Sequence, residues 1–228
     1  MRTLAIGDIH GCFTAFRTLL DAVRPTADDV LVTLGDYIDR GPDSRGVIEM
    51  LLALGDRCQL VSLLGNHEQM MMDARQSSEH FGYWMMCGGR PAIDSYSPTS
   101  ETSGRMADVP DSHWQFLDAT CKEWHETDDH IFVHAGLYHD VPMSEQPAHM
   151  LRWEKLDPYD PYSHESGKLV ICGHTVQKGG VPLHLGSVVC IDTWAYGGGW
   201  LTCMDVASGQ YWQSNERGES RTGVVNAP

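Results

Sequence analysis

The stretch that decides the fold is LAIGDIHG (residues 4–11), where a short apolar run ends in glycine and two side chains able to bind a metal ion, Asp8 and His10. Asp8 and His10 are two positions apart, so in extended chain they face the same side. Four further apolar runs end in a similar way: LVTLGDYIDRG (31–41), LVSLLGNHE (60–68), IFVHAG (131–136) and LVICGHT (169–175). Such a repetition is typical of strand ends that meet at one binding site.

The first third of the chain alternates between two hydrophobic periods. Thr3–Ile6, Val30–Leu34 and Leu60–Leu64 are short β-type runs, whereas residues 12–24 and Pro42–Leu54 place apolar side chains on one helical face. The order β-α-β-α-β predicts parallel strands joined by right-handed crossovers. Such a unit brings the carboxyl ends of its strands to one edge of the sheet.

The rest of the chain predicts a single domain over residues 1–228, with three segments that depart from this pattern. Residues 69–128 contain glycines, prolines and short helical patterns such as Trp114–Trp124, which predict a mostly helical insertion. Residues 138–167 predict a long functional loop, and the polar residues 216–228 predict a flexible tail. Further strand signals lie at Ile131–Val133, Leu169–Cys172, Val188–Ile191 and Trp200–Met204.

The composition limits the class of partner. The 228 residues include 16 Lys and Arg against 31 Asp and Glu, a formal net charge of −15, and 42% are hydrophobic, which is enough for a core. An acidic surface repels a phosphate backbone, so we expect no nucleic-acid polymer as partner. The 12 histidines favour a metal site, because histidine is the commonest metal ligand.

The sequence also predicts a compartment. It has no run of 18 or more apolar residues, so we expect no transmembrane helix and no membrane partner. The first apolar run is too short for the core of a signal peptide. The seven cysteines are scattered and form no Cys-x-x-Cys pair, which is typical of reduced thiols. We therefore expect a cytoplasmic protein, and the oligomeric state stays open.

Five strand ends in one sheet would bring a set of metal-binding side chains into one pocket. These side chains are Asp8, His10, Asp36, Asn66, His134 and His174. Mixed carboxylate, imidazole and amide-oxygen ligands suit Mn²⁺, Fe or Zn²⁺ better than Ca²⁺. Six residues exceed what one ion needs, and a carboxylate such as Asp36 can bridge two ions.

Together the motifs resemble those of the metallophosphoesterase superfamily: GDIHG (7–11), GDYIDRG (35–41), GNHE (65–68), HAG (134–136) and GHT (173–175). More narrowly, they resemble the phosphoprotein phosphatase family of Ser/Thr protein phosphatases in its compact bacterial and phage form. The resemblance extends from Ile6 to about Met204. It implies an α/β, calcineurin-like fold with two mixed β-sheets in a sandwich flanked by helices. It also implies a dinuclear metal site at the carboxyl ends of the strands.

The resemblance implies two divalent metal ions, with Mn²⁺ as first choice and Fe or Zn as alternatives. It assigns one ion to Asp8, His10 and Asp36, and the other to Asp36, Asn66, His134 and His174. A hydroxide bridging the two ions would attack phosphorus directly, without a phosphoenzyme intermediate. The implied activity is hydrolysis of phosphoserine and phosphothreonine, with phosphotyrosine as a further substrate, in proteins or small phosphoesters.

The resemblance also implies roles for side chains beside the ligands. Arg40 would bind two phosphate oxygens with its guanidinium fork, and Asn66 would also contact the phosphate. His67 would act as general acid for the leaving oxygen, and Asp39 would orient His67 and stabilise its charge. Glu68 would make a structural hydrogen bond at its turn.

Compact members of the family usually carry a further phosphate-binding arginine near a tryptophan before the GHT motif, and here the chain departs from that pattern. The stretch reads MLRWEK (150–155), with Arg152 before Trp153 and Lys155 after it. Arg152 is favoured because arginine can bind phosphate through two hydrogen bonds, and Lys155 is the second choice.

The nearest alternative activity is that of a symmetric bis(5'-nucleosyl)-tetraphosphatase, which hydrolyses dinucleoside polyphosphates at the same kind of metal site. That family typically has Ala at the position of Asp39 and Asp at the position of Glu68, so GDYIDRG and GNHE favour the phosphatases. A cyclic-nucleotide phosphodiesterase is a third alternative, although such members generally lack the Asp-Arg-Gly extension. A binding module without activity is a fourth, and the complete ligand set argues against it.

Overall fold

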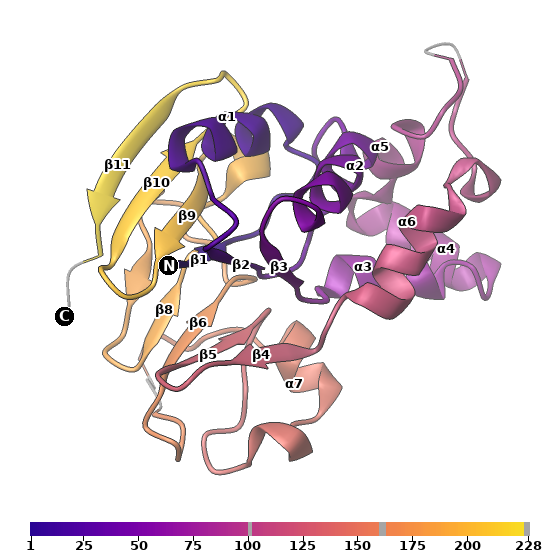
Figure 1. Cartoon of the computed structure of the whole chain (residues 1–228). Helices are drawn as coiled ribbons and strands as arrows, with labels where there is room; N and C mark the ends of the chain where they lie inside the picture. Colours follow the sequence, from indigo (N-terminus) through magenta and orange to yellow (C-terminus); the bar gives the residue numbers. More distant parts are fainter. Residues whose placement is uncertain (100–101, 160–162, 226–228) are drawn as a thin grey trace.

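The computed structural model describes residues 1–99, 102–159 and 163–225, and its strands form two sheets (Figure 1). The six-stranded sheet consists of β11 (Ser220–Val224), β10 (Gln210–Ser214), β9 (Leu201–Asp205), β1 (Thr3–Ile6), β2 (Val30–Thr33) and β3 (Gln59–Ser62), in that order. The five-stranded sheet consists of β4 (Trp124–Glu126), β5 (His130–Val133), β6 (Leu169–Cys172), β8 (Val188–Cys190) and β7 (Leu183–His184). Each sheet is mixed, with a parallel part of three strands, β1-β2-β3 or β5-β6-β8.

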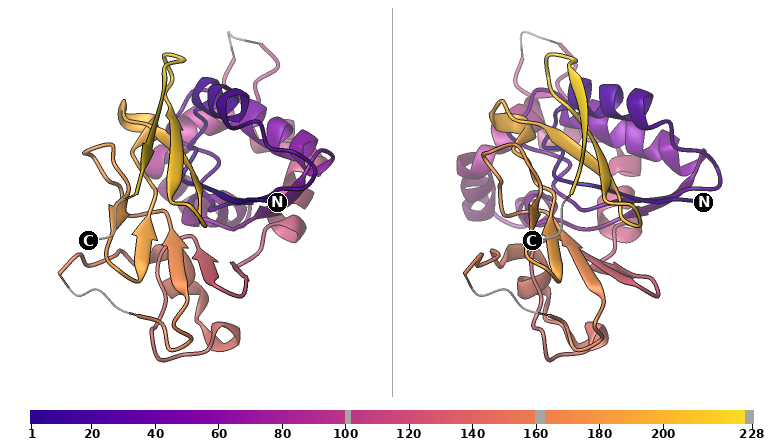
Figure 2. Two further views of the ribbon diagram at one scale, coloured as in Figure 1. Left: turned by 60° about the vertical axis from the view of Figure 1, so that its left-hand side comes forward. Right: turned by 90° about the vertical axis from the view of Figure 1, so that its left-hand side faces the viewer.

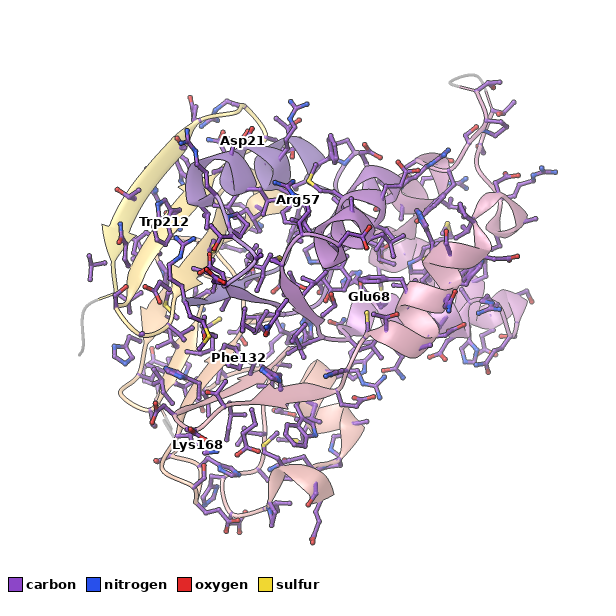
Figure 3. All side chains as sticks on the ribbon, in the orientation of Figure 1. Asp21, Arg57, Glu68, Phe132, Lys168 and Trp212 are labelled. Atoms are coloured by element: carbon purple, nitrogen blue, oxygen red, sulfur yellow. The ribbon has the colours of Figure 1, made fainter. Side chains whose placement is uncertain are left out.

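The two sheets pack face to face around an apolar layer, because alternate residues of a strand point to opposite faces. Ala5 and Val32 of the six-stranded sheet are buried in one cluster with Phe132 and Ile171 of the five-stranded sheet. Phe132 is labelled in Figure 3, between the strands of the two sheets. Leu4 belongs instead to the core on the opposite face of β1, which the helices cover.

In both views of Figure 2, α1 and the five-stranded sheet lie on opposite sides of the six-stranded sheet. α1 buries Ala15, Phe16 and Leu19, and Asp43 caps α2 by accepting a 2.8 Å hydrogen bond from the N–H of Gly46. The α-helices are α1 (Phe13–Val23), α2 (Ser44–Gly55), α3 (Asn66–Asp73), α4 (Ser78–Trp84), α5 (Arg90–Asp94), α6 (Asp111–Gln115) and α7 (Ala148–Trp153). The π-helical segments are η1 (Met85–Gly89) and η3 (Phe116–Thr120), and the short 3₁₀ helices are η2 (Met106–Asp108), η4 (Met143–Glu145) and η5 (Ala195–Gly197). Within the described ranges, no helix is long and apolar enough to cross a membrane.

The predicted parallel strands β1, β2 and β3, with helices between them, are confirmed. The expectation that all five ligand-bearing strand ends belong to one sheet is wrong, because β5 and β6 pair in the second sheet. The two sheets still bring their carboxyl ends together. The Nδ1 of His134, which follows β5, lies 2.8 Å from the backbone oxygen of Leu34, which follows β2. One edge of the sandwich therefore collects strand ends from both sheets.

Three local expectations need correction. The segment 69–128, expected to be mostly helical, also contains β4, and the helix expected over Trp114–Trp124 ends at Thr120. The loop expected over 138–167 contains η4 and α7, although residues 160–162 lie outside the described residues. The flexible tail expected over 216–228 is wrong for the described part, because β11 pairs with β10; residues 226–228 lie outside it. A polar sequence is typical of such an edge strand, which faces water.

Candidate active site

The carboxyl ends of strands from both sheets bring the six side chains predicted to bind metal into one pocket. Asp8 and His10 follow β1, Asp36 follows β2, Asn66 begins α3, and His134 and His174 follow β5 and β6. His174 is half-buried, and the other five are buried, with at most 5% of their surface exposed. Residues separated by more than 160 positions therefore share one small volume.

The backbone of the pocket is strained. Five non-glycine residues adopt a left-handed conformation, with φ of 47° at His10, 51° at Asp36, 71° at Asp39, 67° at Arg40 and 59° at His174. Such values are uncommon outside glycine and persist where the surrounding structure holds them in place. Their concentration in this pocket is typical of a functional site.

Glu68 holds the turn that carries Asp36. Its carboxylate accepts hydrogen bonds from the backbone N–H groups of Asp36 and Tyr37, both at 2.8 Å, and of Gly65 at 3.0 Å. Glu68 is fully buried, so each of these bonds satisfies a group that water cannot reach. The predicted structural role of Glu68 is confirmed.

Hydrogen bonds to the backbone fix the orientation of three imidazole rings. Nδ1 of His10 lies 2.9 Å from the oxygen of Ile38, and Nδ1 of His134 lies 2.8 Å from that of Leu34. His174 uses its other nitrogen, Nε2, which lies 3.1 Å from the oxygen of Trp153. Donation of one ring N–H to a carbonyl leaves the second nitrogen with a lone pair for a metal ion.

Asp36 lies between two groups of potential metal ligands. Its Oδ2 lies 3.4 Å from Nε2 of His10, and its Oδ1 lies 3.5 Å from Nε2 of His134. Oδ1 of Asn66 lies 3.0 Å from the same nitrogen of His134 and 3.1 Å from Nδ1 of His174. The two carboxylate oxygens thus face different sets of ligand atoms, the arrangement that a bridging ligand requires.

Buried negative charge indicates that the pocket fits cations. Burial raises the pKa of Asp8 well above its usual value, and the nearby Asp192 and Asp36 raise it further. Burial also raises the pKa of Asp192 to about 7. Divalent cations would remove this repulsion and keep the carboxylates ionised. The donor set therefore fits metal ions. The predicted site lacks Asp192, which lines the same cavity and directly follows the apolar run Val188–Ile191.

His67 and Asp39 form a buried pair beside the ligands. Nδ1 of His67 lies 2.6 Å from Oδ2 of Asp39, and the indole Nε1 of Trp84 lies 2.9 Å from both oxygens of the same carboxylate. Burial lowers the pKa of His67, but Asp36 and Asp39 outweigh it and hold this pKa above its usual value. His67 also falls in a group of possible metal ligands with His10 and Asp36, since Nε2 of His67 lies 4.0 Å from Asp36 Oδ2.

Arg40 lies at the mouth of the pocket. Its Nη1 lies 2.8 Å from Nε2 of His10, and its guanidinium lies over the ring of Tyr196, 4.5 Å from the centroid. A cavity of about 130 Å³ opens beside it. The cavity is lined by Asp36, Arg40, Asn66, His67, Lys155, His174, Val176, Asp192 and Tyr196. Ligand groups, a guanidinium and an imidazole thus share one small space.

The structure separates the two candidates for a further phosphate ligand. Arg152 lies outside the cavity lining, since its Nη1 donates to Gln69 at 2.9 Å and its Nε lies 3.2 Å from a carboxylate oxygen of Glu123. Lys155, which follows α7, lines the cavity. The preference for Arg152 rested on its capacity for two hydrogen bonds to phosphate, whereas the cavity lining favours Lys155.

Comparison with known proteins gives these residues a family context. A sequence model of the calcineurin-like phosphoesterase family matches residues 1–178. The serine/threonine-protein phosphatase 1 of Salmonella typhimurium is 35% identical over 155 residues, which are 66% of this chain and 62% of the relative. The symmetrical bis(5'-nucleosyl)-tetraphosphatase of Nitrosomonas europaea is 34% identical over 140 residues, which are 60% of this chain and 45% of the relative. The chain thus spans less than two thirds of the length of these curated relatives.

The solved structures agree on the fold. A crystal structure described as a candidate diadenosine tetraphosphatase matches with a TM-score of 0.65 at 20% identity, over 98% of this chain and 93% of that one. The calcineurin-like fold implied by the motifs is confirmed. Because the matched residues 1–178 include all five motifs and every residue of the two ligand groups, the chain belongs to the calcineurin-like phosphoesterase family.

Proposed function

We propose that the protein hydrolyses phosphate monoesters with two divalent metal ions, and that phosphoserine and phosphothreonine are its main substrates. The observation that carries the proposal is the position of Asp36, whose oxygens face His10 and His134 while Arg40 and His67 line the same cavity. Mn²⁺ is the first candidate, with Fe or Zn as alternatives, because the ligands combine carboxylate, imidazole and amide groups. The seven free cysteines favour a reducing compartment such as the cytoplasm.

Two side chains of the cavity, Arg40 and His67, have direct roles in the proposed reaction. The bound metal ions would supply charge neutralisation at the phosphoryl oxygens and a water of lowered pKa. Arg40 would exchange its hydrogen bond to His10 for the phosphate oxygens, which match its guanidinium fork. Asp39 would keep Nδ1–H of His67 engaged at 2.6 Å, so that the protonated Nε2 of His67 can donate to the leaving oxygen.

The substrate class is tested by parallel rates on a phosphoserine peptide, a phosphotyrosine peptide, diadenosine tetraphosphate and a cyclic nucleotide, with Mn²⁺ added to metal-free protein. We expect the highest kcat/KM on the phosphoserine peptide, because Asp39 and Glu68 stand where tetraphosphatases typically have Ala and Asp. A higher kcat/KM on diadenosine tetraphosphate would indicate a bis(5'-nucleosyl)-tetraphosphatase instead. Metal binding without turnover of any substrate would indicate a binding module.

Lys155→Ala is expected to raise KM for the phosphopeptide by roughly tenfold, because a charge-assisted contact to phosphate is lost. Arg152→Ala is expected to change KM much less, since Gln69 and Glu123 already engage its guanidinium. Steady-state kinetics on the phosphopeptide compare the two. Lys178→Ala is the matched control, because Lys178 lies over the ring of Trp194 and is absent from the cavity lining. If Arg152→Ala raised KM more than Lys155→Ala, the phosphate contact would be assigned to Arg152 instead.

A further inference from the structure

We propose that Trp84 is a positioning residue for the general acid: it holds Asp39 in the orientation in which His67 presents its second nitrogen to the substrate. The inference rests on the proposed function of the cavity and adds a residue that lies outside all five motifs. Trp84 is the last residue of α4, and its side chain is fully buried.

The carboxylate of Asp39 is shared between two side chains. Nδ1 of His67 lies 2.6 Å from Oδ2, and Nε1 of Trp84 lies 2.9 Å from both Oδ1 and Oδ2. An indole N–H can donate but cannot accept, so both oxygens of Asp39 must act as acceptors toward it. A buried indole N–H normally has a partner, and Asp39 is that partner here. Trp84 therefore constrains the plane of the carboxylate that His67 meets.

The turn that follows Trp84 is tied to the same loop through the backbone. Gly88, at φ 113°, accepts a hydrogen bond from the N–H of Arg40 at 2.9 Å. Gly89 leaves room for the indole, because a Cβ at this position would lie 2.6 Å from the Trp84 ring. Asp39 and Arg40 both have the left-handed backbone that needs support from its surroundings. The segment 84–89 supplies this support from one side, through one side chain and one carbonyl.

The position of Trp84 has a specific chemical consequence. Without the indole donor, the carboxylate of Asp39 can turn, and the imidazole of His67 loses its fixed direction toward the leaving oxygen. Misorientation of a general acid slows only those reactions in which the leaving group needs a proton. An alkoxide, as from phosphoserine, needs one, whereas para-nitrophenolate is stable without it. A positioning role thus predicts losses that depend on the leaving group.

Trp84→Phe keeps an aromatic ring and removes the N–H. We expect kcat for a phosphoserine peptide to fall roughly 10- to 100-fold, and kcat for para-nitrophenyl phosphate to fall less than about threefold. His67→Asn and the double variant are measured in parallel. We expect the double variant to match His67→Asn alone, because the two residues act through one proton transfer.

Tyr96→Phe is the matched control for loss of a buried hydrogen bond in the same core. The hydroxyl of Tyr96 lies 2.9 Å from Nδ1 of His113, and neither residue lines the cavity. Its rates on both substrates are expected to equal those of the wild type. The positioning role would be overturned if Trp84→Phe lowered kcat equally on both substrates. It would also be overturned if Trp84→Phe lowered kcat by the same factor in the His67→Asn background as in the wild type. If the wild type hydrolyses neither substrate, the proposed function fails, and a spectroscopic test decides the role of Trp84.

The spectroscopic test needs no turnover. In ¹⁵N-labelled wild-type protein, the indole N–H of Trp84 is expected to exchange with D₂O at least roughly tenfold more slowly than that of the half-buried Trp194. The Nδ1–H resonance of His67 is expected to move in Trp84→Phe and to stay unchanged in Tyr96→Phe. An indole N–H of Trp84 that exchanges as fast as that of Trp194 would overturn the hydrogen bond to Asp39, whether or not the variant folds.

Discussion

Asp36→Asn is expected to remove both metal ions and to lower kcat/KM for every phosphomonoester by more than roughly 100-fold, since loss of even an outer partner of a metal ligand costs 10- to 100-fold. The reason is the central position of Asp36. Its Oδ2 lies 3.4 Å from His10 and its Oδ1 lies 3.5 Å from His134. An amide replaces one of these oxygens by an NH₂ group, which cannot bind a cation.

Asp8→Asn is the matched comparison, because the family resemblance assigns Asp8 to one ion only. Asp8→Asn is expected to weaken the binding of that ion and to leave the other ion bound. Metal content of dialysed protein, measured by mass spectrometry, distinguishes the variants. Oδ1 of Asp36 also accepts from the backbone N–H of His67 at 3.1 Å, so thermal unfolding must show that Asp36→Asn is folded. A folded Asp36→Asn protein with two ions per chain would contradict the bridging role.

Strand positions could be predicted because each central strand is buried on both faces and reads as a continuous apolar run. The sheet to which each strand belongs could not be predicted from the sequence. Ile131–Val133 and Leu169–Cys172 have the same apolar character as Val30–Thr33, yet they pair in the other sheet. Pairing depends on contacts between distant residues, such as the parallel bridge between Leu63 and Lys122, and local periodicity carries no information about these contacts.

The metal-ligand candidates could be predicted because each lies within a few residues after an apolar run, in a short motif. Trp84 could not, since its contact with Asp39 spans 45 positions and nothing in its local sequence distinguishes it from the other tryptophans of the chain. The choice between Arg152 and Lys155 depended on the end of a helix. Arg152 lies in the last turn of α7 and reaches Gln69, whereas Lys155 lies beyond this helix and reaches the cavity.

His67→Asn is expected to lower kcat for a phosphoserine peptide by roughly 10²- to 10⁴-fold and to affect para-nitrophenyl phosphate far less. Asparagine cannot deliver a proton near neutral pH, and para-nitrophenolate leaves without one. The variant is expected to keep two ions per chain. This result matters because His67 also lies within reach of His10 and Asp36 as a possible ligand. Loss of an ion, together with equal losses on both substrates, would place His67 among the metal ligands.

The pH dependence of kcat tests the same assignment independently. Burial lowers the pKa of His67, but Asp36 and the hydrogen-bonded Asp39 hold it above its usual value. Bound metal ions would offset the charge of Asp36 and leave Asp39 as the main support. Because an acid must be protonated to act, kcat for the phosphopeptide should fall about tenfold per pH unit above the pKa of His67 in the metal-loaded protein. His67→Asn should lack the alkaline decline, and a variant that retains it would show that another group carries the essential proton.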